Sequence, residues 1–230
     1  MSAAGYPTPQ ATRPTPRWGI ALVILLAALL VLLLALTVAA ATRPAEYRPA
    51  SIDYNLLRVD KRDLARLLDE IGAGLNGGSP VRVLLNEQQT NRWLAARAEV
   101  WPDEVPDVAG FPETQVRFLD GRIRVLMLLE RNPWSCVLTL DWQITLSDEQ
   151  AVLACDAARI GVLPVPARWA LATAGSLLGN PEWSWTLAGG RLAHANEWRW
   201  PNGKQRFRLR GLQVQPGALA IELVPIPSWH

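Results

Sequence analysis

Residues 136–146 read CVLTLDWQITL, and this stretch is the clearest strand signal in the chain. Every second side chain is apolar, and the side chains between them are mostly polar. A period of two puts alternate side chains on opposite faces of a strand, so one face of this strand is expected to be buried. Residues 147–150, SDEQ, read as a turn, and residues 151–157 carry the same alternation back. The stretch therefore predicts a long antiparallel strand pair.

The two cysteines of the chain, Cys136 and Cys155, fall on this predicted pair. If the turn closes tightly, Cys155 faces Trp142 on the opposite strand and Cys136 faces Gly161. The cysteines then share a face but lie roughly 20 Å apart along the strands. A disulfide needs Cα atoms within about 7 Å. We expect two buried free thiols.

The flanking sequence carries further hairpins and three helical patterns. Asp120-Gly121 favours a two-residue hairpin loop, and apolar side chains recur at every second position on both sides of it. Four more period-two segments follow between residues 183 and 223, separated by Gly and Pro turns. Helical spacing occupies residues 60–75, 87–97 and 166–178. The pattern predicts an α+β fold: an N-terminal transmembrane helix, then a curved antiparallel sheet packed on a few helices.

Residues 72–77 read GAGLNG and match the G-x-G-x-x-G fingerprint of dinucleotide-binding folds. That fingerprint binds phosphate when it follows a strand and opens a helix, because the helix N-terminus supplies the N–H groups. Here a helix that we expect to begin at Asp60, as its N-cap, runs into the glycines, and residues 81–85 after them read as a strand. This order is the reverse of a nucleotide site. We expect the glycines to provide positive φ angles and slack at a helix end.

Residues 19–41 contain no charged side chain and as a helix would span roughly 35 Å, enough to cross the hydrocarbon core of a bilayer. This length exceeds that of a signal-peptide core and predicts an uncleaved anchor. The small-residue run Ala39-Ala40-Ala41 leaves cleavage by a signal peptidase as the alternative. Arg13 and Arg17 precede the span, without an acid among them, and we expect this short tail to stay inside while the large domain is exported.

These signals divide the chain into four parts in a single-pass protein of the plasma (inner) membrane. The parts are a disordered cytoplasmic tail (1–17), a transmembrane helix (18–41), a spacer (42–56) and an extracytoplasmic α+β domain (57–230).

Charge and motif content argue against several functions. The net charge of +2, from 23 basic and 21 acidic residues, gives no bulk signal for nucleic-acid binding. The sequence contains no Cys/His/Asp cluster with metal spacing, no G-x-S-x-G and no P-loop lysine. Asp141 and Asp156, on neighbouring predicted strands, are the best candidates for a catalytic carboxylate pair, although such residues more often form the solvated side of a strand. We expect no catalytic residue, metal site or cofactor.

The chain has 11 tryptophans, which is many for its length, and two W-x-W pairs put indoles on the same sheet face. One interpretation is aromatic packing in a core or interface, because an indole buries a large area wherever it packs. The other is an apolar cavity or a belt that touches lipid. On that interpretation the ligand-binding residues are Trp142, Trp169, Trp183, Trp185, Trp198 and Trp200.

A row of cations also follows a period of two, at Lys204, Arg206, Arg208 and Arg210. A solvated strand face is the ordinary interpretation. Next to a membrane, such a row can also meet anionic headgroups.

Two stretches resemble the YpmS-like family of single-pass bacterial envelope proteins. Residues 81–94, VRVLLNEQQTNRWL, are similar to the strand that opens this family's domain and the helix after it, which carries a Glu and an Asn before a Leu. Residues 160–166, IGVLPVP, are similar to the family's Ile-Gly, apolar-Pro-apolar-Pro passage from a long strand into a helix. The family resembles in architecture the tubular lipid-binding class, in which a curved antiparallel sheet wraps a helix around an apolar groove. The resemblance carries over no catalytic residue.

The anchor, the apolar strand faces and the tryptophans together predict an extracytoplasmic domain that binds membrane lipid or another apolar ligand. The alternative is a structural or assembly subunit whose sheet edge or aromatic patch docks another envelope protein. Neither hypothesis involves catalysis or a nucleic acid.

Overall fold

The computed structural model describes residues 17–100, 113–131, 134–171, 186–188, 191–201 and 205–227. The chain forms two compact units, Met1–Val38 and Ala39–His230. Helix α1 (Arg17–Ala41) holds a stretch, Ala21–Ala41, that is long and apolar enough to cross a membrane. An apolar helix in this position is compatible with a single-pass anchor and with a signal sequence.

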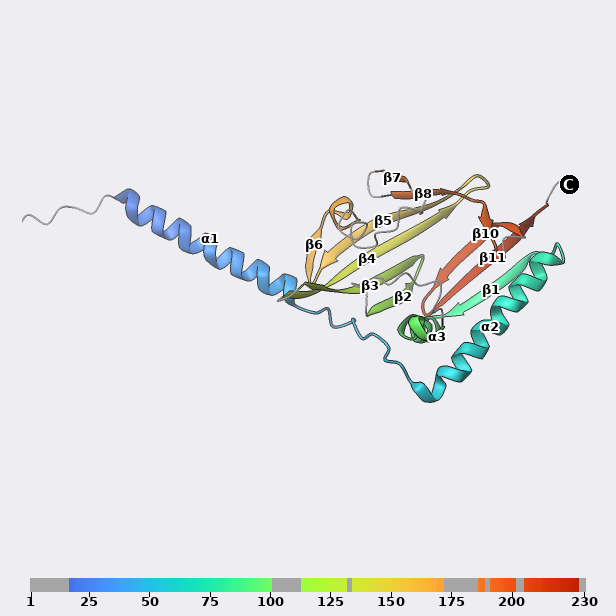
Figure 1. Ribbon diagram of the computed structural model, residues 1–230. Coiled ribbons are helices and arrows are strands. Elements are labelled where there is room, and N and C mark those ends of the chain that lie inside the picture. Colours follow the sequence, from blue (N-terminus) through green and yellow to red (C-terminus); the bar gives the residue numbers. More distant parts are fainter. Residues whose placement is uncertain are drawn as a thin grey trace, which may run out of the picture. The chain divides into compact units, whose positions relative to one another are not determined.

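The larger sheet of the second unit contains the hairpins expected from the alternating pattern (Figure 1). All of its strand pairs are antiparallel, and its order is β2-β3-β4-β5-β8-β7, with β6 paired to β5. The loop between β2 and β3 is the predicted Asp120-Gly121 dipeptide, and Gly121 has a φ of 66°. The strands are β2 (Thr114–Leu119), β3 (Arg122–Arg131), β4 (Trp134–Leu146), β5 (Gln150–Ile160), β6 (Leu163–Val165), β7 (Thr186–Ala188) and β8 (Arg191–Ala195).

The remaining strands form a second sheet, so the single predicted sheet is divided in two. Its order is β1-β11-β10-β9, again antiparallel. Helix α2 (Tyr54–Asn76) packs on one face of it through a cluster of Ile71, Leu75, Val83 and Leu223. The strands are β1 (Val81–Asn86), β9 (Trp198–Arg199), β10 (Arg206–Gln215) and β11 (Ala218–Ile226). The predicted α+β class with antiparallel pairing is confirmed.

The short helices lie close to the expected positions. Asn86 caps α3 (Glu87–Ala95), because its side chain accepts hydrogen bonds from the backbone N–H groups of Gln88 and Gln89. A four-residue helix, α4 (Arg97–Val100), follows. Residues 167–171 are helical at the start of the third predicted helix, and residues 172–178 of that prediction lie outside the described residues.

The predicted register of β4 and β5 is right at the turn and wrong beyond it. Cys155 does face Trp142, but Asp141 pairs with Ala157, so the strands shift by one residue at a β-bulge. The predicted pairing of Cys136 with Gly161 is therefore wrong, since the bulge leaves Asp156 without a partner in the ladder. Both cysteines are free, as predicted; Cys155 is buried and Cys136 is half-buried.

The start of α2 also differs from its prediction. The N-cap is Asp53, whose carboxylate accepts a hydrogen bond from the backbone N–H of Asn55. Asp60 lies inside the helix, where it is 4% exposed and forms an ion pair with Arg92 of α3 at 3.1 Å. The first turn of α2 could not be predicted from apolar spacing. Its apolar side chains, among them Tyr54, are exposed and do not continue the buried stripe of the helix.

The glycines of the fingerprint serve close packing more than positive φ. Gly72 and Gly74 lie within α2, and a Cβ would stand 3.3 Å from the Nε1 atom of Trp200 at Gly72 and 2.3 Å from Val81 Cγ2 at Gly74. Gly78 alone of this run has positive φ, at 72°. The fingerprint thus forms the last turns of a helix that must approach the neighbouring sheet closely.

Candidate functional site

The spacer after α1 lies along one face of the seven-stranded sheet, and we call residues 42–53 the strap. Tyr47 fixes the strap to the sheet, because its ring is 8% exposed and packs with Leu126, Leu128 and Val137. Its hydroxyl donates to the backbone oxygen of Glu113 at 3.1 Å and to a carboxylate oxygen of the same residue at 3.2 Å. Burial, and then the negative charge of Glu113, raise the pKa of Tyr47 well above its ordinary value.

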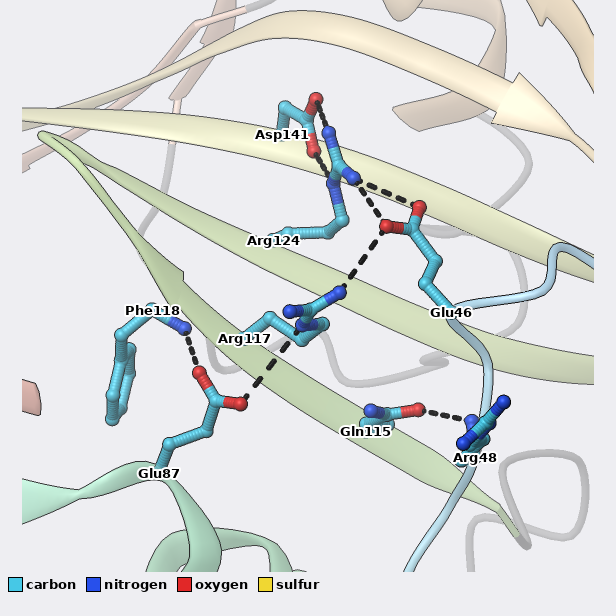
Figure 2. Close-up of polar contacts among 8 residues, drawn as sticks. All are labelled: Glu46, Arg48, Glu87, Gln115, Arg117, Phe118, Arg124 and Asp141. Atoms are coloured by element: carbon cyan, nitrogen blue, oxygen red, sulfur yellow. Dashed lines mark hydrogen bonds and ion pairs between the residues drawn. The ribbon is translucent and has the colours of Figure 1, made fainter. Parts of the chain in front are cut away.

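Beside Tyr47, charged side chains from the strap and from two strands form a network (Figure 2). Arg124 of β3 donates Nε to one oxygen of Asp141 at 2.6 Å and Nη2 to the other at 2.8 Å. Its Nη1 donates to both carboxylate oxygens of Glu46 on the strap, at 2.8 and 2.7 Å. The hydrogen bond to Asp141 is the first of the interactions that raise the pKa of Arg124 above its ordinary value. The guanidinium is therefore locked as a cation between two carboxylates.

The same network reaches α3. Arg117 of β2 lies 3.4 Å from Glu46 and 3.9 Å from Glu87 (Figure 2). The backbone N–H of Arg48 donates to the side-chain oxygen of Gln115 at 2.7 Å. The strap is thus fixed by side-chain and backbone contacts, and these link it to the helix that joins the two sheets.

Two side chains of α3 cover the outer edge of β2. Asn91 donates to the backbone oxygen of Val116 and accepts from its N–H, both at 2.7 Å, as a neighbouring strand would. Glu87 accepts from the N–H of Phe118 at 2.7 Å. These are the Glu and the Asn of the family-like stretch at residues 81–94. Their structural role is to satisfy an edge strand that would otherwise be open.

A second asparagine joins the two sheets in the same way. Asn196, 3% exposed, donates to the backbone oxygen of Leu209 at 2.8 Å and accepts from its N–H at 2.9 Å. The same amide donates to the oxygen of Ser147 in the β4–β5 turn at 2.7 Å. Asn196 therefore holds the β4–β5 turn to β10 of the other sheet, whereas Asn91 holds α3 to β2.

The two carboxylates predicted as candidate catalytic groups, Asp141 and Asp156, each form an ion pair with an arginine. Asp141 is held by Arg124, and Asp156 lies 3.8 Å from Arg122, so each predicted catalytic carboxylate has its own cation. Burial, and then the charges of Asp141 and Asp156, raise the pKa of Cys155 to about 11. Burial also raises the pKa of Cys136. The described residues bring no three His, Cys, Asp or Glu side chains together in an arrangement for a metal ion.

The structure places the predicted tryptophans in different surroundings. Trp142, 9% exposed, belongs to the core on the apolar face of the larger sheet. Trp200 packs against α2 in the cluster of the smaller sheet, edge-on to Phe207 at 6.2 Å. Trp198 stacks on His194 at 4.5 Å, and Trp169 is 53% exposed.

Trp183 and Trp185 lie outside the described residues. Trp142 and Trp200 belong to separate apolar clusters, so these two do not line one common surface. Whether any of the six tryptophans contacts a ligand stays a prediction.

The predicted row of cations on β10 is matched by acids. Arg206 pairs with Glu197, Arg208 lies 3.4 Å from Asp148, and Arg210 lies 3.5 Å from Glu222. These arginine side chains are between 42% and 64% exposed, so solvent screens the pairs. Lys204 lies outside the described residues.

Sequence reasoning gave no role to the β5–β6 turn, although its residues belong to the family-like stretch 160–166. Gly161 has a φ of 58°, and a Cβ there would stand 2.3 Å from the backbone oxygen of Ala40. The next residue, Val162, donates its N–H to the backbone oxygen of Ala39 at 3.1 Å. Ala39 and Ala40 belong to the last three residues of α1, which are part of the second unit, so this turn caps the last turn of the apolar helix.

Comparison of the chain with protein-family models, with curated proteins and with solved structures gives no match. The resemblance to the YpmS-like family therefore stays a prediction that rests on residues 81–94 and 160–166.

Proposed function

We propose that the protein is an uncleaved single-pass membrane protein whose extracytoplasmic, non-catalytic domain binds a lipid or another apolar ligand on the apolar face of the seven-stranded sheet. The observation that carries the proposal is the contact of Ala39 and Ala40 with Gly161 and Val162, because it joins the end of the apolar helix to the end of that face.

The contact favours an anchor over a signal sequence. The carbonyl of Ala39 accepts a hydrogen bond from the folded domain, and Gly161 leaves space for the carbonyl of Ala40. Cleavage after Ala41 would remove both partners and leave the Val162 N–H without its acceptor. The candidate cleavage site is also helical, and Ala39 and Ala40 are partly buried, whereas a peptidase requires accessible, extended chain.

The apolar face of the sheet is the surface that suits an apolar ligand. Its centre is closely packed around Leu138 and Leu140, at 1% and 2% exposure. Around that centre, apolar side chains are only partly buried, and one of them, Ile160, immediately precedes the turn that caps α1. This rim therefore begins next to the turn that contacts Ala39 and Ala40. The partly buried set includes Ile123, Val125, Leu129, Leu153, Ile160, Val165 and Leu192.

The strap face of the same sheet is less suited to an apolar ligand. There the strap, Arg124 and Asp141 close the surface with paired charges, and Tyr47 fills its apolar part. A ligand would have to break these pairs to bind there. We place the ligand on the other face for this reason, and the short tail with Arg13 and Arg17 on the cytoplasmic side.

The test is native mass spectrometry of the full chain released from mild detergent, with two matched variants on adjacent residues of β5. Leu153→Gln places an amide on the apolar face, and Val152→Gln places the same amide on the opposite face. We expect co-purified lipid with the unmodified chain and Val152→Gln, and at least a tenfold lower lipid-bound fraction with Leu153→Gln. Absence of lipid from the unmodified chain, or equal retention by both variants, would sink the proposal.

A second candidate is an assembly subunit, favoured by the position of β1. Among the described strands, β1 lies at an edge of the four-stranded sheet, and its Leu84 is 69% exposed. An exposed edge strand can accept a strand from another protein through main-chain hydrogen bonds. A photo-cross-linking residue at position 84 that captures one stoichiometric envelope protein, with no lipid on the purified chain, would favour this candidate over lipid binding.

A further inference from the structure

We propose that the β5–β6 turn, with Val162 as its exposed residue, is a lipid-contact surface that enters the headgroup region of the bilayer. The inference rests on the retained anchor of the proposed function, and it does not require a ligand on the apolar face. It assigns a membrane-contact role to a turn and to the chain that follows it.

The β5–β6 turn contacts the end of the apolar stretch. The N–H of Val162 donates to Ala39 at 3.1 Å, and Ala39 lies within the stretch Ala21–Ala41. One hydrogen bond therefore separates the turn from a residue of the span itself. A span of this length ends near the boundary between hydrocarbon and headgroups, so a group bonded to its last turn lies at that boundary.

The turn and the segment after it expose apolar side chains. Val162 is 50% exposed, whereas the Val, Leu and Ile side chains of the flanking strands β5 and β6 are all partly buried. Trp169, just beyond β6, is 53% exposed, and an indole favours the membrane–water interface. Two exposed apolar side chains on the segment that leaves this turn match a surface that rests on lipid.

The segments after α1 and after β6 also carry exposed cations. Arg43, two residues after α1, and Arg168, beside Trp169, are both exposed. Among the described residues, neither arginine has a carboxylate within 4.0 Å, whereas each arginine of β10 named above is paired with an acid. Cations next to an apolar tip suit a bilayer that contains anionic lipid.

The geometry also explains the glycine. A two-residue loop between Ile160 and Leu163 with positive φ at its first position calls for glycine there. The missing Cβ also allows the carbonyl of Ala40 to approach, since a Cβ at position 161 would lie 2.3 Å from it. A protein partner needs no such continuity with the span, whereas the bilayer surrounds the span already. We therefore commit to lipid as the occupant.

The test measures the depth of a nitroxide at position 162 in the full chain, reconstituted in nanodiscs of phosphatidylcholine and phosphatidylglycerol. Val162→Cys and Leu84→Cys are made in a chain with Cys136→Ala and Cys155→Ala, and each carries the same label. Leu84 is the matched control, because it is an exposed aliphatic residue on β1 of the other sheet (Figure 1). Power saturation compares collisions with oxygen, which concentrates in lipid, and with a water-soluble nickel complex.

We expect oxygen to relax the label at 162 more than the nickel complex does, and the reverse at 84. Equal behaviour of the two labels overturns the inference, and so does a water-like label at 162. A chain that does not enter nanodiscs contradicts both the retained anchor and this contact. A lipid-facing label at 162 in a chain that carries no lipid by native mass spectrometry supports the contact and removes the ligand of the proposed function.

Discussion

The two faces of the seven-stranded sheet are covered through different kinds of interaction. On the strap face, Arg124 lies between Glu46 and Asp141, and these charged contacts depend on direction as well as distance, beside the apolar packing of Tyr47. On the other face, Leu140 and Trp142 pack among aliphatic side chains, where contact depends on area and volume. The strap face therefore holds a specific segment of its own chain. The contacts on the apolar face carry no such directional requirement.

The largest expected effect comes from removing the cation of the strap face. Arg124→Leu would leave the carboxylate of Asp141, 4% exposed, without a partner. Breaking a buried pair on one side costs about 3–5 kcal/mol, because an uncompensated charge stays buried. We expect a loss of that size in the free energy of unfolding, measured by urea titration of the full chain in detergent micelles.

Its matched control is Arg122→Leu on the same strand. Arg122 is 50% exposed and lies 3.8 Å from Asp156, so solvent screens the pair and its loss should cost less than about 1 kcal/mol. Similar losses for both variants would mean that the Arg124 network is no more specific than a surface pair, and the contrast between the faces would fail.

The next largest expected effect is a loss of stability at high pH caused by the buried thiol of Cys155 on the apolar face. The pKa of Cys155 is raised from 9.0 to about 11 by burial and by two nearby carboxylates, so the folded chain keeps a proton that the unfolded chain loses. The stabilisation is present below pH 9 and is lost as the pH rises through 11, by about 2–3 kcal/mol. Cys155→Ala should remove this part of the decline. Urea titrations at pH 8 and pH 10.5 measure it.

Tyr47 also has a raised pKa and stays in both proteins, so it contributes the same decline to each. The difference between the unmodified chain and Cys155→Ala therefore reports the thiol alone. Parallel declines in the two proteins would show that the thiol is solvated and that this part of the apolar face is open to water.

A smaller effect is expected where the end of α1 meets the sheet. Gly161→Ala and Gly121→Ala both place a side chain at positive φ, at 58° and 66°, which costs roughly 1 kcal/mol. At Gly121 no atom lies within 4 Å of the added carbon, whereas at Gly161 the backbone oxygen of Ala40 lies at 2.3 Å. Gly161→Ala should therefore cost about 1 kcal/mol more than Gly121→Ala in thermal unfolding. Equal losses of thermal stability in the two variants would show that the backbone at Ala40 can move to accommodate the added carbon without cost.

The strands could be predicted from the sequence because their signal is local. The alternation at residues 136–146 fixes which side chains share a face, and Asp120-Gly121 fixes one hairpin loop. The bulge at Asp156 could not be predicted, since nothing in the order of side chains shows an extra residue in a ladder. Local patterns thus gave the pairing of strands but not the point at which their register changes.

The candidate site was harder to predict because its parts are distant in sequence. Glu46 and Tyr47 lie in a stretch without periodicity, and the partner of Glu46 is Arg124, 78 residues away. The sequence pattern indicates Asp141 as a possible catalytic acid, but it does not reveal the cation on the neighbouring strand, Arg124. The tryptophans were assigned by residue type, and residue type does not say which apolar cluster an indole enters, as Trp142 and Trp200 show.

The smallest expected effect comes from removing a single oxygen atom on the strap face. Tyr47→Phe keeps the ring between Leu126 and Val137 and removes the hydroxyl that donates to Glu113 at 3.1 and 3.2 Å. The loss of the hydrogen bonds should cost about 1 kcal/mol in the free energy of unfolding, while the strap stays in place. The strap is checked by limited proteolysis at Arg43 and Arg48.

The comparable change on the other face is Leu140→Met, which conserves volume at a side chain that is 2% exposed. An apolar core absorbs such an exchange for less than about 1.5 kcal/mol, and here it breaks no hydrogen bond. If Tyr47→Phe is neutral, the ring alone holds the strap, and the strap face is as tolerant as the apolar one. If it instead exposes Arg48 to protease, one hydroxyl decides whether the chain after α1 stays on the sheet, because the ring's apolar contacts are unchanged in that variant.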